Sequence, residues 1–148
     1  SDWSEQERID SGAILDAQTL YPTINGFAGP NGLQATRDFI GGMFTSAFDR
    51  ARLDWVIEQN LELPRRHAAT LLYNHATQDW RDAIRRITLP TLIVGGRTSL
   101  IPWRSQAWMH SVIPGSRLEI FEAEDGGNHF PFMENPTKFN AVLADFVG

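Results

Sequence analysis

A histidine near the end of the chain stands in a sequence context that suits acid–base chemistry. His129 follows a Gly-Gly pair at 126–127 and precedes Asn135-Pro136, a pair typical of a helix start. The apolar residues before the glycines, within 118–121, predict a short strand that leads into this loop. An imidazole placed there can take up and release a proton near neutral pH. The alternative is an ordinary solvated loop histidine, because single histidines on loops are common.

The other titratable residues are weaker candidates. Glu124 and Asp125 lie close to His129 in the sequence, but a carboxylate on the same loop rarely reaches back to a ring nitrogen, so solvated loop charges are the better interpretation. The remaining histidines have no partner pattern and no metal-binding spacing with an intervening acid: His67, His75 and His110. The sequence therefore predicts no metal site.

Composition limits the classes of partner. The 148 residues are 42% apolar and 21% charged, which is ordinary for a globular domain. A net charge of −5 argues against a nucleic-acid surface, and no apolar run approaches the length of a membrane span. The absence of cysteine excludes disulfides and thiolate metal sites. We therefore expect small-molecule partners, no nucleic acid and no membrane and, with no signal peptide visible, a cytoplasmic protein.

Two strand–helix units at the end of the chain position His129. Thr88 to Gly96 is a continuous β-branched and aliphatic run closed by two glycines, as expected for a buried parallel strand. A helix carrying Trp108 and Val112 follows, then the strand before His129, and then a helix over Pro136–Val147. The last helix has one apolar face: Phe139, Val142, Leu143 and Phe146. Strand, helix, strand and helix with short loops predict two βα units of a parallel sheet.

The residues before these units are predominantly helical. Apolar residues recur at helical spacing over residues 5–20, 33–44, 50–61 and 65–76 and over a short stretch capped by Asp79. Residues 21–32 are rich in Pro, Gly and Asn and predict a loop. Inward positions are predicted for Leu33, Thr36, Ile40, Met43, Phe44, Leu53, Val56, Ile57, Leu61, Ala69, Leu72, Tyr73, Ala76, Trp80, Ala83, Ile84 and Ile87. Because one crossover connection needs far fewer residues, these helices predict an inserted cap.

The start of the chain predicts that part of the fold is supplied elsewhere. Ser1-Asp2-Trp3-Ser4 carries no initiator Met and leads directly into helical residues. Helices followed by only two strands make too small a sheet to stand alone. We therefore expect an N-terminal half of the same fold, as a separate chain or as a cleaved segment.

The order of these segments resembles the C-terminal half of the α/β-hydrolases, cap included. The shared segments are Asp-Trp-Arg at 79–81, Ile-x-x-Pro-Thr-Leu-Ile-Val-Gly-Gly at 87–96, Ile-Pro-Gly-Ser-Arg-Leu-Glu-Ile-Phe at 113–121 and Gly-Gly-x-His at 126–129. The resemblance implies an α/β fold with a loop over 1–4, a helical cap over 5–87 and the C-terminal βαβα part of the mostly parallel sheet over 88–148. It also implies a nucleophile on a G-x-S-x-G elbow, an acid and a histidine, in that order. No such elbow occurs in these residues, so it would lie in the preceding half.

The acid points to a narrower resemblance. Most α/β-hydrolases place it after the penultimate strand, where residues 95–102 contain no carboxylate, and some place it ahead of the cap, which corresponds to Asp2. Asp2-Trp3 together with His129-Phe130-Pro131 resembles the cofactor-independent 2,4-dioxygenases of 3-hydroxy-4(1H)-quinolones and quinaldines. This resemblance implies that His129, oriented by Asp2, is the general base that deprotonates the substrate 3-hydroxyl. The anion would react directly with O2 and lose carbon monoxide. No cofactor would be needed, and the partners would be O2 and an aromatic heterocycle such as an alkylquinolone signal.

Aromatic and sulfur-containing side chains could line a binding site for such a flat substrate. The candidates are Trp3, Met43, Phe44 and Phe130, and ordinary packing is the alternative for each of them. Two other functions stay open. One is a serine hydrolase of esters, lactones or amides with a Ser/Asp/His triad. The other is a non-catalytic fragment that needs its N-terminal partner.

Overall fold

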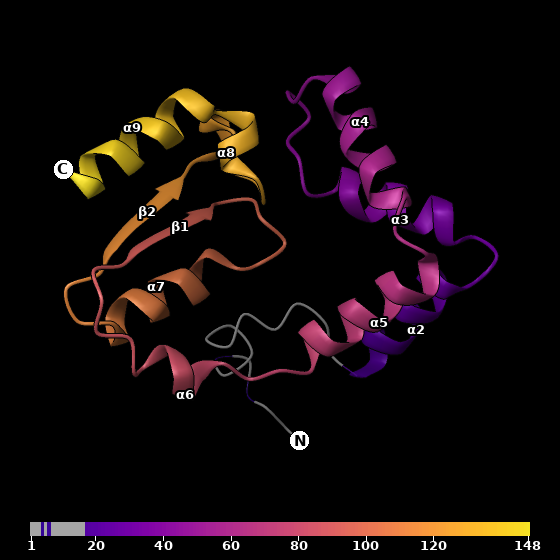
Figure 1. Cartoon of the computed structure of the whole chain (residues 1–148), viewed down its shortest axis with the longest axis horizontal. Helices are drawn as coiled ribbons and strands as arrows, with labels where there is room; N and C mark the ends of the chain where they lie inside the picture. Colours follow the sequence, from indigo (N-terminus) through magenta and orange to yellow (C-terminus); the bar gives the residue numbers. More distant parts are fainter. Residues whose placement is uncertain (1–3, 5, 7–16) are drawn as a thin grey trace. The chain divides into compact units, whose positions relative to one another are not determined.

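The chain divides into a helical unit and a unit built around two strands. Figure 1 shows the computed structural model, which describes residues 4, 6 and 17–148. Residues 14–78 form one compact unit, and residues 79–148 belong to the other. The assignment of the helical residues to a cap over a catalytic core remains a prediction.

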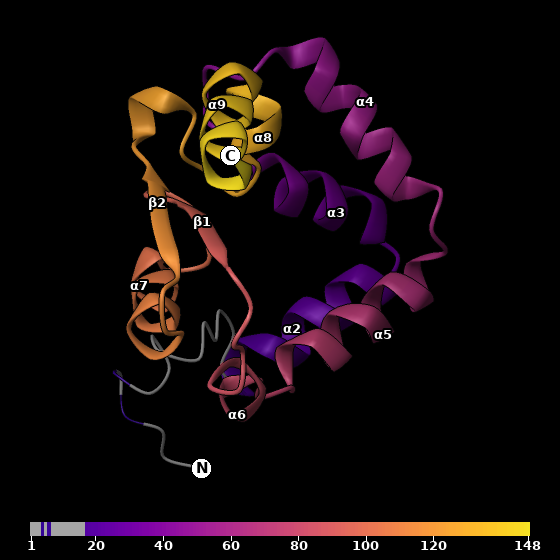
Figure 2. The same cartoon turned by 60° about the vertical axis from the view of Figure 1, so that its left-hand side comes forward.

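Four helices make up the described part of the helical unit. They are α2 (Ala17–Ala28), α3 (Gly32–Gly41), α4 (Arg50–Leu61) and α5 (Arg65–Ala76). Helix α2 lies alongside α5, and α3 packs against both α2 and α4 (Figure 1, Figure 2). The buried apolar side chains of these helices are Leu20, Phe27, Ile40, Val56, Ile57 and Ala69, and Met43 and Phe44 in the segment between α3 and α4 are buried as well. The predicted bounds of α4 and α5 are confirmed.

The predicted loop over 21–32 is wrong for most of its length. Helix α2 continues through Pro22 and ends only at Ala28, before Gly29-Pro30. Packing explains the difference, because Phe27 is 6% exposed and its ring meets that of Phe39 edge-on at 5.4 Å. The contacts of α2 with α3 and α5 thus outweigh the local preference of proline for a break. Most of the helix predicted over 5–20 lies outside the described residues.

Four side chains before residue 88 that were predicted to face inward are exposed: Leu33, Tyr73, Trp80 and Ala83. Leu33 is 58% exposed, because the buried row of α3 runs through Thr36 and Ile40 instead. Trp80 is 57% exposed, because it precedes the four-residue helix α6 (Arg81–Ile84) and is not part of its apolar side. Leu33 and Trp80 each lie at a helix end, where the helical period no longer determines direction.

The strand-containing unit has the predicted order of strand, helix, strand and helix. After α6 come β1 (Leu92–Gly96), α7 (Trp103–Val112) and β2 (Arg117–Phe121), then η1 (Ala123–Asp125), α8 (Pro131–Glu134) and α9 (Pro136–Val147). Strands β1 and β2 are parallel, with a register from Leu92 opposite Arg117 to Gly96 opposite Phe121. Helix α7 packs against both strands. The sequence did not predict η1 and α8, and it placed the start of β1 too early, at Thr88.

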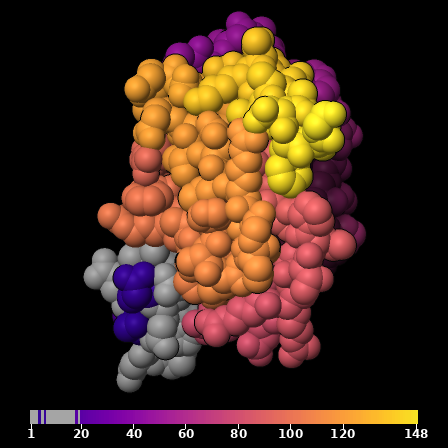
Figure 3. All heavy atoms as spheres, turned by 90° about the vertical axis from the view of Figure 1, so that its left-hand side faces the viewer, coloured from indigo at the N-terminus to yellow at the C-terminus, as the bar shows by residue number. Residues whose placement is uncertain are grey.

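The core of this unit forms around β2. Phe121 is 0% exposed, and its ring lies 6.4 Å from that of Phe139 on α9. Figure 3 shows one face of the unit, where the orange residues of α7 and β2 lie beside the yellow α9. Leu143 on α9, predicted to pack inward, is 43% exposed, because only two strands are available to cover it in the described structure. Among the residues that the structure describes, no helix combines the length and apolar character that a membrane span requires.

Candidate functional site

The loop between η1 and α8 carries His129, as the sequence predicted. Gly126 turns the chain in the left-handed region, with φ of 76°, and a β-carbon there would lie 2.6 Å from Cβ of Glu134. Few residues other than glycine accept that conformation. The turn therefore folds the loop tightly between the end of β2 and helix α8, and His129 follows it three residues later.

The histidine loop is bound to the loop that follows β1. The backbone N–H of Thr98 donates to the carbonyl of Gly127 at 2.9 Å, and the Thr98 hydroxyl donates to the same oxygen at 3.0 Å. A β-carbon at Gly96 would lie only 2.0 Å from the carbonyl oxygen of Asn128. The carboxyl ends of two adjacent parallel strands thus hold the two loops in direct contact, which is where open α/β sheets bind ligands.

Ser99 on the β1 loop contacts the ring of His129. Its Oγ lies 3.1 Å from His129 Nδ1 and also accepts the Ile101 N–H at 3.1 Å. The ring of Phe130 meets His129 edge-on, with centroids 4.8 Å apart. His129, Ser99 and Phe130 are half-buried. Ser99 was not predicted as a site residue from the sequence, in which this loop lacks a carboxylate. The shared strand edge was a signal that the two loops would meet.

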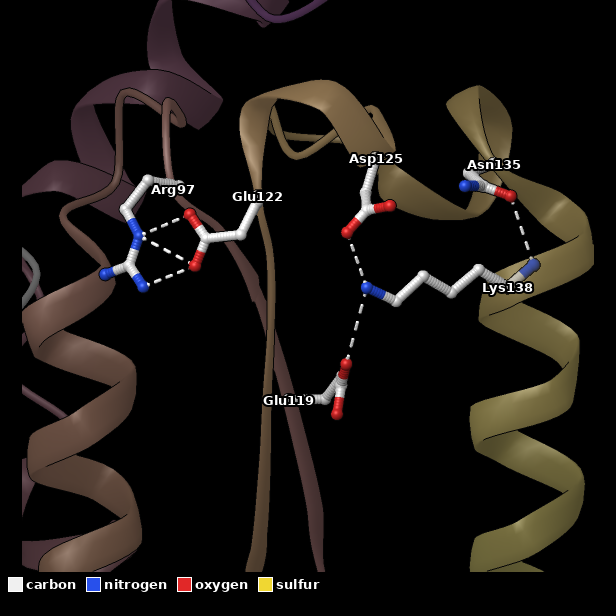
Figure 4. Close-up of polar contacts among 6 residues, drawn as sticks. All are labelled: Arg97, Glu119, Glu122, Asp125, Asn135 and Lys138. Atoms are coloured by element: carbon white, nitrogen blue, oxygen red, sulfur yellow. Dashed lines mark hydrogen bonds and ion pairs between the residues drawn. The ribbon is translucent and has the colours of Figure 1, made fainter.

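The acids near His129 in sequence are bound to cations (Figure 4). Arg97 donates to both carboxylate oxygens of Glu122, at 2.9 and 2.6 Å. The Lys138 ammonium donates to Asp125 at 2.7 Å and lies 3.7 Å from Glu119. Asp125 is therefore ion-paired rather than a solvated loop charge, and Glu124 is exposed as expected. These pairs fasten the segment before His129 to β1 and α9.

These ion pairs shift the pKa values of their members. Hydrogen bonds from the Arg97 guanidinium lower the pKa of Glu122 below its usual value. The hydrogen bond to Asp125 raises the pKa of Lys138. Both effects favour the charged forms, so the ion pairs that hold the segment before His129 stay formed across the neutral pH range.

Replacing Glu122 tests the Arg97–Glu122 ion pair through the pH dependence of stability. Because the folded-state pKa is lowered, the pair contributes stability above the ordinary glutamate pKa of 4.5 and loses it as pH falls through the lowered value. We expect Glu122→Gln to cause a small drop in Tm at pH 7, and the difference from wild type to disappear toward pH 3. Thermal melts from pH 3 to 7 measure this. Glu124→Gln, which removes an equal charge from an exposed neighbour, is the control, and a Tm difference that does not change with pH would contradict the expectation.

The other predicted site residues are distributed between the two units. Asp2 and Trp3 lie outside the described residues. Met43 and Phe44 are buried in the helical unit, and Phe44 stacks on Phe48 at 4.4 Å. Of the four predicted pocket residues, the structure therefore brings Phe130 to His129 and gives Met43 and Phe44 a packing role. Their contact with a substrate remains a prediction. Within the described ranges, no group of three His or acidic side chains could hold a metal ion.

The helical unit has a separate hollow of about 330 Å³. Its walls are mostly apolar and include Phe27, Ile40 and Leu72. Arg65 also lines it and donates to the Thr36 hydroxyl at 2.6 Å and to two backbone carbonyls, of Asn60 and Leu63. These bonds tie the start of α5 to α3 and to the end of α4.

Known proteins resemble this chain in sequence and in structure. No family model matches the chain. An uncharacterized protein of Mycobacterium tuberculosis is 32% identical over 81 residues, which cover 49% of this chain and 23% of that protein. A pimeloyl-[acyl-carrier protein] methyl ester esterase of Neisseria meningitidis is 34% identical over 70 residues, which cover 47% of this chain and 26% of the esterase.

Solved structures match a larger part of the chain. A bromoperoxidase from Bacillus anthracis superposes with a TM-score of 0.85 and 19% identity, covering 98% of this chain and 52% of that one. An esterase from Exiguobacterium antarcticum superposes with a TM-score of 0.78 and 23% identity, covering 88% of this chain and 47% of the esterase. An enol-lactonase from Burkholderia xenovorans superposes with a TM-score of 0.69 and 18% identity, covering 88% of this chain and 50% of the lactonase. The chain thus spans about half the length of each of these structures.

These likenesses identify the fold. The chain has the α/β-hydrolase fold, and the predicted fold class is confirmed. Within that fold, the names of the relatives are mainly those of ester and lactone hydrolases. They favour the hydrolase alternative over the quinolone dioxygenase, which these comparisons do not support.

Proposed function

We propose that this chain is part of an α/β-hydrolase that cleaves carboxylic esters or lactones, with His129 as its general base. The observation that carries the proposal is the position of His129. It is half-buried on the loop at the carboxyl end of β2, against the loop at the carboxyl end of β1. In this fold the triad histidine comes last in the chain, after the serine and the acid. The esterase and the lactonase among the similar proteins support the same class of reaction.

The chemistry requires two functions of the imidazole. It takes the proton of a serine hydroxyl as that oxygen attacks the ester carbonyl, and it then returns the proton to the leaving alkoxide. The 148 residues contain no G-x-S-x-G. On this proposal the serine and the oxyanion donors belong to a part of the fold outside these residues. Asp2, the acid predicted from the sequence, lies outside the described residues.

The cofactor-free dioxygenase is the second candidate. Asp2-Trp3 and His129-Phe130-Pro131 are the features that favour it. The same base would then take its proton from a substrate 3-hydroxyl rather than from a serine. Oxygen dependence separates the two reactions, because ester hydrolysis consumes no O2.

The test uses the full-length protein in metal-chelated buffer. We expect turnover of short aryl esters and lactones under argon, and covalent labelling by a serine-directed phosphonate that stops the turnover. Oxygen uptake is measured in parallel on a 3-hydroxy-4(1H)-quinolone. Stoichiometric O2 consumption with no ester or lactone turnover would replace the hydrolase by the dioxygenase. Inactivity on all three substrate classes would leave the non-catalytic alternative.

A further inference from the structure

The loop after β1 presents an oriented hydroxyl to the ring of His129. Ser99 Oγ lies 3.1 Å from His129 Nδ1. The same oxygen accepts the Ile101 N–H at 3.1 Å, so the backbone of its own loop fixes its position. Both side chains are half-buried, which limits competition from water for this contact.

The frame around this pair is rigid. Two hydrogen bonds from Thr98 to the Gly127 carbonyl join the loops immediately beside Ser99 and His129. The Arg97 N–H donates to the carbonyl of Phe121 at 2.9 Å, one residue beyond the end of β1. These hydrogen bonds hold the two loops together and so keep Ser99 Oγ within reach of His129 Nδ1.

We propose that Ser99 is the positioning residue of His129: it accepts a hydrogen bond from Nδ1–H and so keeps Nε2 as the proton acceptor. The inference rests on the proposed function, because a base that acts through Nε2 requires this tautomer. A hydroxyl oxygen has two acceptor sites, of which Ile101 N–H occupies one and Nδ1–H fills the other. If the hydroxyl instead donated to Nδ1, the ring proton would lie on Nε2, which could then accept none from a serine.

The neutral hydroxyl of Ser99 affects how readily the ring of His129 becomes protonated. A hydroxyl orients the ring but carries no negative charge, so it stabilises the imidazolium less than a carboxylate does at the same place. Ser99→Asp adds that charge next to Nδ1. It should favour the protonated ring, so the acid limb of the kcat/KM profile should move to higher pH, by about 1 unit or more.

The first test is the tautomer itself, measured by ¹⁵N NMR on the full-length protein. His129→Gln assigns the signals, since the chain contains three other histidines. We expect the neutral His129 ring to be protonated at Nδ1 in wild type and to become a mixture of tautomers in Ser99→Ala. Protonation at Nε2 in wild type would overturn the proposal, whether or not any variant folds.

The second test is kinetic. Ser99→Ala is expected to lower kcat on an ester or lactone by about 10- to 100-fold with little change in KM, because an unoriented base loses alignment and not binding. Ser99→Thr keeps the hydroxyl and should recover most of the activity. Ser116→Ala is the matched control, because Ser116 Oγ lies 2.9 Å from Nδ1 of His110 in an exposed pair of the same kind.

The outcomes separate this inference from the proposed function. A tautomer and a pH profile that stay unchanged in Ser99→Ala, but change in Asp2→Ala, would assign the positioning role to Asp2 and overturn the proposal. A wild-type protein without ester or lactone activity would remove the proposed function. The NMR result would still decide whether Ser99 accepts from Nδ1.

Discussion

His129→Ala is expected to remove essentially all hydrolytic activity, with a fall in kcat of about 10³-fold or more and little change in Tm. Without the imidazole, the proposed base that takes the proton from the attacking hydroxyl is missing. The ring is half-buried at the loop surface, so its loss leaves no large cavity in the core around Phe121. Initial rates on the best ester or lactone, with thermal melts of the same preparations, measure both quantities.

The chain itself offers the control for this variant. His110 also pairs with a serine hydroxyl, but it is exposed at the end of α7 and remote in sequence from the two loops. His110→Ala should therefore retain wild-type kcat. Turnover at the wild-type rate in His129→Ala would contradict the proposed base and would also end the dioxygenase alternative, because both reactions begin with proton removal by this ring.

Helices with local end signals could be predicted from the sequence. Helix α4 begins where the Asp49 carboxylate accepts the Arg52 N–H at 2.9 Å, and α9 begins where the Asn135 side chain accepts the Lys138 N–H at 3.1 Å. Pro64 precedes the first residue of α5 and marks its start without a side-chain cap hydrogen bond. The continuation of α2 beyond residue 20 could not be predicted, because Pro22 indicates a break and the packing of α2 on α3 and α5 overrides it.

The candidate site was also predictable only where the signals are local in the sequence. The glycine pair, the preceding strand and the helix start all lie within a few residues of His129, so its place on a loop was visible in the sequence. Ser99 is 30 residues away, and its contact with the ring depends on the parallel register of β1 and β2. A single sequence shows that the two loops share an edge, but not which side chain of one loop reaches the other. Asp125 is a similar case, because its partner Lys138 lies 13 residues further along the chain, on α9.

Gly96→Ala should be among the most damaging single methyl additions to the site. The new β-carbon would lie 2.0 Å from the Asn128 carbonyl oxygen and 2.4 Å from that of Gly127, and both are backbone atoms of the histidine loop. To relieve the overlap, the loop must move away from β1 and carry His129 with it. We expect a loss of about 1–3 kcal/mol in the free energy of unfolding. A displacement near 1 Å would lower kcat/KM by about 100-fold.

Gly95→Ala adds the same methyl one residue earlier and separates this effect from any general cost of changing a glycine in β1. Its β-carbon would meet Cγ of Gln106 at 3.0 Å, which belongs to a side chain that can shift, and not to the backbone of the histidine loop. We therefore expect a cost below about 1 kcal/mol and nearly unchanged kcat/KM. Urea unfolding and kcat/KM on one substrate compare the two variants. If the two variants had the same free energy of unfolding and the same kcat/KM, the close contact of the two loops would not be what holds His129 in place. The proposed positioning of His129 by Ser99 would then lose its structural support.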